Sequence, residues 1–244
     1  MKSLIQSCLR QIGYELRRVA HTGTAYETIS PYAKYSPWNT DREFRETYET
    51  IRNNTLVDIF RCYQLWHLLG QTTHIDGAIV EVGVWRGGTG CLQAKRAQLL
   101  GIKNPVYLCD TFSGVVKAGS NDTQYFGGEH ADTSIPVVEA LASSLGVSSQ
   151  IKLLQGIFPE DTSHQIKESA VRFCYIDVDV YQSTKEILEW IWPRLAVGGI
   201  VVSDDYGMEG TSGVTICIDE FEVNAPGAAS IYNLTGQAIL VKTS

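Results

Sequence analysis

From Ala78 onward, short apolar runs alternate with longer amphipathic segments. The apolar runs are rich in β-branched and aromatic residues, which predicts strands, and the segments between them have apolar residues at helical spacing. The predicted strands are Ala78–Val84, Val106–Phe112, Ile151–Gln155, Arg172–Val178 and Gly199–Asp204, and the predicted helices are Gly88–Leu100, Ile135–Leu145 and Thr184–Leu195. Because each crossover helix must bury its apolar stripe, this alternation predicts a parallel sheet covered on both faces.

The C-terminal end of the pattern is different. Ser230–Leu234 and Ala238–Lys242 flank a turn at Thr235–Gln237, which predicts an antiparallel β-hairpin. A doubly wound, mostly parallel α/β sheet that ends in such a hairpin is typical of the Rossmann-like fold of class I methyltransferases, whereas plain dinucleotide-binding halves lack the hairpin. We therefore predict this fold class.

The N-terminal segment precedes the alternating pattern. Met1–Ala20 predicts a basic amphipathic helix, which we expect to pack on its own domain or on a dimer mate rather than on a membrane surface or an acidic partner. Residues 21–54 are irregular to weakly helical, and their aromatic side chains either cover the core or form a lid. Leu56–Leu69 predicts a helix that ends at Gly70. The expected division is an N-terminal helical and lid extension over residues 1–54 and a catalytic domain over residues 55–244.

Composition narrows the class of protein. The chain has 244 residues and a net charge of −7, which argues against a general nucleic-acid binder. Its apolar runs are too short to span a bilayer. The six cysteines are Cys8, Cys62, Cys91, Cys109, Cys174 and Cys217, and none forms a C-x-x-C pair. We interpret them as reduced core thiols of a cytoplasmic protein.

A glycine-rich turn follows the first predicted strand. Gly83, Gly87, Gly88 and Gly90 have the spacing Gly-x-x-x-Gly-Gly-x-Gly, which differs from the Gly-x-Gly-x-x-Gly of dinucleotide sites. Glycines allow a tight turn and let a ligand approach the amide groups at a helix N-terminus, although such turns often serve only close packing. The spacing favours S-adenosylmethionine, which carries no phosphate, over a pyrophosphate ligand.

Asp110 supplies the second half of the predicted cofactor site. It lies at the carboxyl end of the second strand, where an acid can accept hydrogen bonds from both ribose hydroxyls. A turn or capping aspartate is the competing interpretation. The predicted cofactor-binding residues are Glu81, Gly83, Val84, Gly87, Asp110, Thr111, Phe112, Gly156, Ile157 and Phe158.

Carboxylates follow the fourth and fifth predicted strands. Asp177 ends the fourth strand, and Asp204 and Asp205 end the fifth, so these side chains are expected to converge beside the cofactor. Gathered carboxylates repel one another, and a divalent cation such as Mg²⁺ relieves that repulsion. We interpret Asp179 as a structural residue that bonds backbone or caps the next helix. Among the histidines, only His130 is an acid–base candidate.

These motifs together resemble one family. Glu81–Gly88, Asp110–Gly114, Asp177–Thr184 and Gly198–Tyr206 are similar to the macrocin O-methyltransferase family, in matching order from about residue 50 to residue 242. The resemblance implies methyl transfer from S-adenosylmethionine to sugar hydroxyls of antibiotics and related metabolites. It also implies that Asp177, Asp204 and Asp205 bind the metal and that Asp177 is a candidate general base. This sequence departs from the family at Val178, where glycine is frequent, and over Met208–Thr215.

The predicted function is therefore a Mg²⁺-dependent O-methyltransferase acting on a small-molecule hydroxyl, with a sugar or polyol favoured and catechol-like or polyketide hydroxyls next. In this prediction, Asp177 or a metal-bound water accepts the proton that the reacting hydroxyl loses. An NAD-dependent oxidoreductase is the first alternative, and a catalytically silent scaffold member of the fold is the second. A homodimer through the N-terminal helix is a further prediction.

Overall fold

The computed structural model describes residues 9, 11, 14, 25–26 and 33–244. The chain divides into a unit over Met1–Ala33 and a compact unit over Lys34–Ser244, which holds the sheet. The helix predicted over Met1–Ala20 lies largely outside the described residues. Within the described part of the chain, no helix has the length and apolar character needed to cross a membrane.

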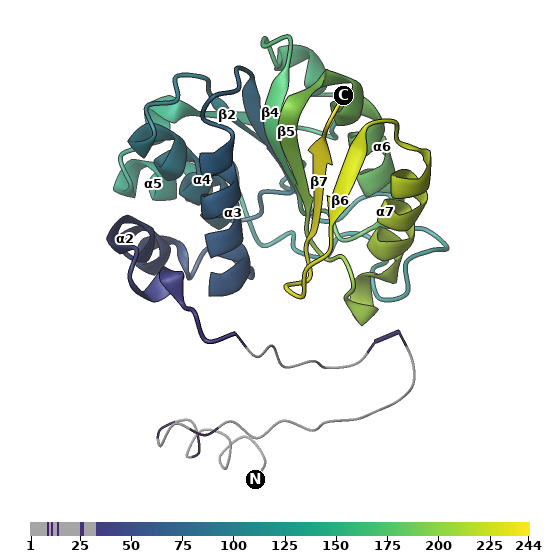
Figure 1. The fold of residues 1–244 in the computed structure, drawn as a ribbon, viewed down its shortest axis with the longest axis horizontal. Coiled ribbons are helices and arrows are strands. Elements are labelled where there is room, and N and C mark those ends of the chain that lie inside the picture. The colour runs from purple at the N-terminus through teal and green to yellow at the C-terminus, as the bar shows by residue number, and fades with distance from the viewer. Residues whose placement is uncertain (1–8, 10, 12–13, 15–24, 27–32) are drawn as a thin grey trace. The chain divides into compact units, whose positions relative to one another are not determined.

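A seven-stranded sheet forms the centre of the compact unit (Figure 1). Its strands are β1 (Ala78–Val82), β2 (Val106–Asp110), β3 (Ile151–Gln155), β4 (Val171–Ile176), β5 (Leu195–Ser203), β6 (Ala228–Ile231) and β7 (Ala238–Lys242). The strand order is β3-β2-β1-β4-β5-β7-β6. Strands β1 to β5 run parallel, and β7 pairs antiparallel with both β5 and β6. The predicted fold class is confirmed, including the C-terminal hairpin.

Helices cover both faces of the sheet, as Figure 1 shows. They are α2 (Arg42–Ile51), α3 (Ile59–Gln71), α4 (Gly88–Leu99), α5 (Ile135–Ser144), α6 (Tyr181–Ile191) and α7 (Ser212–Asn224). One apolar core joins α2, α3, α4 and α5 to one face, and a second core joins α6 and α7 to the other. The cysteines of the described part are all buried and free, as predicted for core thiols.

Helix α3 differs from its prediction at both ends. It begins after Asp58, whose Oδ1 accepts hydrogen bonds from the backbone N–H groups of Phe60 and Arg61 at 2.8 and 3.1 Å. It continues through Gly70 to Gln71, and at Gly70 the guanidinium of Arg96 lies close to the backbone, 2.9 Å from where a Cβ would stand. Leu56 and Phe60, which lie within the predicted helix range, are both exposed.

Three further elements correct the sequence interpretation. Helix α2 is regular although weak helix was predicted; Asp41 caps it and also accepts a hydrogen bond from Nε1 of Trp66 at 3.1 Å. Helix α7 was not predicted. The capping role considered for Asp179 is wrong, because Asp122 Oδ1 accepts the hydrogen bond from the first backbone N–H of α6, at 2.9 Å.

Candidate functional site

The carboxyl ends of the central strands are held together by backbone hydrogen bonds that continue past the strands. The N–H of Asp177 donates to the carbonyl of Val82 at 2.9 Å, and the N–H of Asp204 donates to the carbonyl of Ile176 at 2.8 Å. On the other side, the N–H of Gly83 donates to the carbonyl of Cys109 at 3.0 Å. The segments after β1, β2, β4 and β5 therefore meet at one edge of the sheet, at the point where the strand order reverses.

One cavity at this edge is lined by most of the predicted site residues. It includes the predicted cofactor residues Gly83, Val84, Asp110, Thr111, Gly156, Ile157 and Phe158, and the aspartates Asp177, Asp204 and Asp205. Glu81, Gly87 and Phe112 were also predicted to bind the cofactor, and they lie outside the cavity lining. The cavity thus brings the glycine turn and the aspartates into a single space.

Glu81 is buried behind the glycine turn rather than exposed to the cavity. Its carboxylate accepts a hydrogen bond from Oγ1 of Thr89 at 2.9 Å and another from Nε2 of Gln93. Burial raises the pKa of Glu81 to about 8. The side chain therefore braces the first turns of α4 beneath the cavity floor.

Two glycines of the turn are required by packing. Gly83 has φ +88°, and a Cβ there would lie 1.7 Å from the carbonyl oxygen of Asp177. Gly87 has φ +84°, and its Cβ would lie 2.7 Å from Cγ1 of Val138. The first of these close approaches is what lets the turn lie directly beside the end of β4.

Asp110 organises the backbone around the cavity. Its Oδ2 accepts hydrogen bonds from the N–H groups of Val84 and Trp85 at 2.7 and 2.9 Å, and its Oδ1 accepts one from Phe112 at 2.6 Å. This is the turn role that sequence analysis considered as the alternative. An ionised carboxylate offers about four lone-pair sites, so Asp110 can hold the turn and still accept further hydrogen bonds from a ligand in the cavity.

Oxygen atoms of Asp177, Asp179 and Asp205 lie within 4.8 Å of one another. Oδ2 of Asp205 is buried and has no hydrogen-bond partner among the residues that the structure describes. Burial, together with the neighbouring carboxylates, holds the pKa of Asp177 and of Asp205 well above the usual range. Such a cluster of oxygen donors suits a hard divalent cation.

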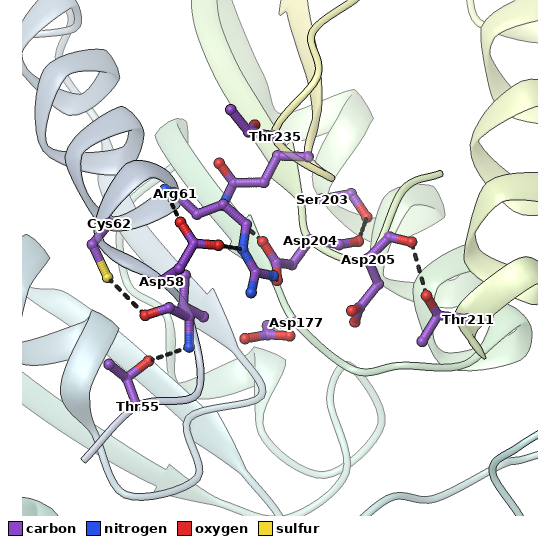
Figure 2. Close-up of polar contacts among 12 residues, drawn as sticks. Thr55, Asp58, Arg61, Cys62, Asp177, Ser203, Asp204, Asp205, Thr211 and Thr235 are labelled. Atoms are coloured by element: carbon purple, nitrogen blue, oxygen red, sulfur yellow. Dashed lines mark hydrogen bonds and ion pairs between the residues drawn. The ribbon is translucent and has the colours of Figure 1, made fainter. Parts of the chain in front are cut away.

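Asp204 has different partners from the other aspartates (Figure 2). Its Oδ2 pairs with Nη1 of Arg61, and its Oδ1 accepts a hydrogen bond from Nε2 of Gln237 at 2.7 Å. Burial raises the pKa of Asp204 to about 6, and the guanidinium opposes that rise. Arg61 also lines the cavity and was missed by sequence analysis. The one feature that could have pointed to Arg61 is that it is a charged residue at a partly buried position of the predicted helix Leu56–Leu69.

The segment between β2 and α5 forms a further wall of the cavity. It contributes Tyr125 and His130, whose side chains approach at 3.5 Å between the tyrosine oxygen and Nε2. Burial and the carboxylate of Asp179 raise the pKa of Tyr125. His130, the acid–base candidate, therefore does lie in the cavity, beside Trp85.

Polar contacts fasten this segment to the rest of the domain. Lys117 pairs with Glu160, after β3, and with Glu186, on α6. Asp122 caps α6. At the other end of the segment, Asp132 accepts a hydrogen bond from Nε1 of Trp85 at 2.8 Å. The wall is thus tied to both the cofactor side and the aspartate side of the cavity.

Several cavity residues have left-handed backbone. Trp85, His130, Asp179 and Asp205 all have positive φ, between 47° and 66°. Such conformations cost about 1–3 kcal/mol each and gather where a fold must aim particular side chains. Their concentration here favours the cavity as the candidate functional site.

Comparison with known proteins agrees with this geometry. The family model for macrocin-O-methyltransferase (TylF) matches residues 52–239. The chain belongs to this family.

Two characterised relatives are similar to this family member. Mycinamicin III 3''-O-methyltransferase of Micromonospora griseorubida is 28% identical over 178 residues, which cover 68% of this chain and 69% of that protein. An 8-demethyl-8-(2,3-dimethoxy-alpha-L-rhamnosyl)-tetracenomycin-C 4'-O-methyltransferase of Streptomyces olivaceus is 28% identical over 144 residues, which cover 55% of each chain.

Solved structures show the same fold. The O-methyltransferase NovP matches with a TM-score of 0.69 and 22% identity over 78% of this chain and 83% of that one. TomG from Streptomyces achromogenes, solved in complex with S-adenosylmethionine, matches with a TM-score of 0.55 and 14% identity over 84% and 91%. This family member therefore shares the fold of these O-methyltransferases. The comparisons support methyl transfer to a hydroxyl and do not favour an oxidoreductase.

Proposed function

We propose that the protein transfers the methyl group of S-adenosylmethionine to a hydroxyl of a sugar-bearing small molecule, with Mg²⁺ or another divalent cation at the aspartate cluster. The single observation that carries this proposal is the shared cavity, whose lining includes Gly83 and Asp110 together with Asp177 and Asp205. The reaction needs a donor site and an acceptor site within bonding reach, and one cavity with both kinds of lining meets that need.

The aspartates fit a cation on chemical grounds. Asp205 has a buried oxygen without a partner in the described part of the chain, and Asp177 and Asp179 present oxygens to the same space. The ligands predicted from sequence were Asp177, Asp204 and Asp205, so the two sets share Asp177 and Asp205. When bound, a divalent cation supplies Lewis-acid activation of a hydroxyl.

The protein's own residues then have distinct roles in the proposal. Asp177 accepts the proton of the reacting hydroxyl, since burial and its acidic neighbours hold its pKa well above the usual range for an aspartate. Asp110 orders the turn amides and accepts hydrogen bonds from the ribose of the donor. Fixing donor and acceptor in line supplies the largest part of the rate, up to about 7–11 kcal/mol in model systems.

We propose a sugar hydroxyl as the acceptor because the tetracenomycin-C relative is named for a rhamnosyl substrate. Trp85, Tyr125 and His130 give the cavity ring faces on which a sugar can pack. Asn54, the last residue of the predicted extension, also lines the cavity, which supports a lid role for the end of that extension. A cytoplasmic location and a homodimer belong to the same proposal.

Calorimetry with and without Mg²⁺, followed by a mass-shift screen for one added methyl group on a panel of glycosides, tests the proposal. We expect Mg²⁺ to bind and turnover to stop in excess EDTA. Asp204→Ala should abolish turnover while S-adenosylmethionine still binds, and Asp205→Asn should lose Mg²⁺ binding.

Asp76→Asn is the matched control for these variants, because the Asp76 side chain is 95% exposed and lies outside the cavity lining. Undiminished turnover in EDTA, or Mg²⁺ binding that survives Asp205→Asn, would refute the metal part of the proposal. Failure of S-adenosylmethionine to bind would refute the donor part.

A further inference from the structure

Tyr125 places a phenolic hydroxyl beside the aspartate cluster. The tyrosine belongs to the segment between β2 and α5 and lines the cavity. Its hydroxyl donates a hydrogen bond to the carboxylate of Asp179 and lies 3.5 Å from Nε2 of His130. Oxygens of Asp179, Asp177 and Asp205 lie within 4.8 Å of one another. The phenol therefore borders the space that we assign to the cation and the reacting hydroxyl.

This hydroxyl differs from the other hydroxyls of the cavity lining. Those that the structure describes are engaged by backbone groups or by the buried carboxylate of Glu81, and they belong to Thr55, Thr89, Thr111 and Ser183. Tyr125 instead hydrogen-bonds to Asp179, whose side chain belongs to the aspartate cluster. Its oxygen is therefore placed among the polar side chains that an acceptor in the cavity would meet.

The position of the ring is fixed by contacts on both sides of it along the chain. Before Tyr125, Asp122 accepts the hydrogen bond from the first backbone N–H of α6 at 2.9 Å. After it, the carboxylate of Glu129 accepts hydrogen bonds from the N–H groups of Phe126 and Gly127 at 2.8 and 2.9 Å. The phenol is thus delivered to the cavity by a braced backbone, as a group that reads a ligand must be.

A phenol suits the recognition of another hydroxyl. It has one O–H donor and two acceptor lone pairs, so a phenol that donates to Asp179 can still accept a hydrogen bond. It is also neutral, so it adds no charge to a cavity whose lining already holds several carboxylates. Oxygens on adjacent carbons of a sugar lie close together, so a group beside the reacting oxygen is within reach of its neighbour.

We propose that Tyr125 binds the acceptor, and that its hydroxyl accepts a hydrogen bond from the hydroxyl next to the one that is methylated. The site then selects a vicinal diol and determines which of its two oxygens faces Asp177. The inference rests on the proposed function and adds a residue that sets acceptor specificity.

Deoxygenated acceptors test this role. The probes are the 4-nitrophenyl glycoside that the parent protein methylates best and its two analogues that each lack one hydroxyl next to the methylated one. With the parent, one analogue should lose about tenfold in kcat/KM, which is what one hydrogen bond in a desolvated site contributes. Tyr125→Phe should lose about tenfold on the intact glycoside and should treat that glycoside and the same analogue alike, within about twofold.

Two results would overturn the inference. If Tyr125 only braces Asp179, Tyr125→Phe will lose the same factor on every probe, and the preference for the intact glycoside will persist. If the parent itself is indifferent to both analogues, no protein group reads the neighbouring hydroxyl. The second comparison needs no variant, so it stands even if Tyr125→Phe does not fold, which thermal melts verify.

Tyr181→Phe is the matched control. The Tyr181 hydroxyl also donates to a carboxylate, Oε2 of Glu220 at 2.6 Å, but the residue lies outside the cavity lining, so selectivity among the three probes should not change. Calorimetry should show S-adenosylmethionine bound by Tyr125→Phe within about twofold of the parent, because the loss concerns the acceptor alone. A parent that binds no donor and methylates no glycoside would refute the proposed function and this inference with it. A parent that methylates, with unchanged selectivity in Tyr125→Phe, would refute the inference alone.

Discussion

Glu81 allows a sharp test of the electrostatics beneath the cavity. It is fully buried, its pKa is raised from 4.5 to about 8, and its carboxylate contacts Thr89 and Gln93. Oε1 of Gln93 is buried without a partner in the described part of the chain, which fits a protonated Glu81 that donates to a reoriented Gln93 amide. We therefore predict that Glu81→Gln makes the folded protein less sensitive to alkaline pH.

The sign follows from linkage. A carboxyl group whose pKa is higher in the folded state than in the unfolded state stabilises the fold fully below about pH 4.5, and that stabilisation is lost as pH rises toward about 8. A pKa difference of one corresponds to about 1.4 kcal/mol, so the loss amounts to about 5 kcal/mol at most. Glutamine keeps an acceptor for Thr89 and cannot ionise.

Urea unfolding at pH 5 and pH 9 measures the effect. At pH 5 the free energies of unfolding of Glu81→Gln and the parent should agree within about 1 kcal/mol, and at pH 9 the variant should be more stable by about 2–5 kcal/mol. Glu139→Gln, at an exposed position of α5, is the matched control and should show no pH-dependent difference. Equal differences between variant and parent at the two pH values would refute the reasoning.

Two other predictions concern backbone and capping. Gly83→Ala should destabilise the fold by more than about 3 kcal/mol, because its Cβ would lie 1.7 Å from a backbone oxygen at positive φ; a melting temperature close to that of the parent would contradict this account. Asp41→Ala should cost about 1–2 kcal/mol in urea unfolding, since it removes the cap of α2 and the partner of the Trp66 indole, whereas Asp41→Asn should retain most of the stability; equal losses in the two variants would argue against the capping role.

The sheet could be predicted because its signals are local. Strand β3 was predicted with its observed bounds, and β1, β2 and β4 within two residues, since buried parallel strands appear as apolar runs bounded by turns. Helix α7 was missed because its periodicity is weak: Gly213 and Thr215 interrupt the apolar positions of Ser212–Asn224. Its stability comes from packing against α6, which sequence does not display.

The site residues, like the helices and strands, could be predicted from sequence only where their position depends on local signals. Residues that end strands, such as Asp110 and Asp177, could be located because topology alone sends them to one edge of the sheet. Arg61 could not be located in this way, because its contact with Asp204 depends on where α3 lies across the sheet end. Glu81 was expected in the cofactor pocket, but in a strand buried on both faces its side chain points beneath α4 and away from the cavity.

The cavity wall between β2 and α5 has a consequence for engineering. Lys117 and Asp122 anchor it to residues on other elements, so Tyr125 is positioned by contacts that lie outside its own segment. A segment grafted from another member of the family would bring new cavity-facing side chains and could lack the partners of Glu160, Glu186 and the first turn of α6. Exchanges in this wall should therefore keep Lys117 and Asp122.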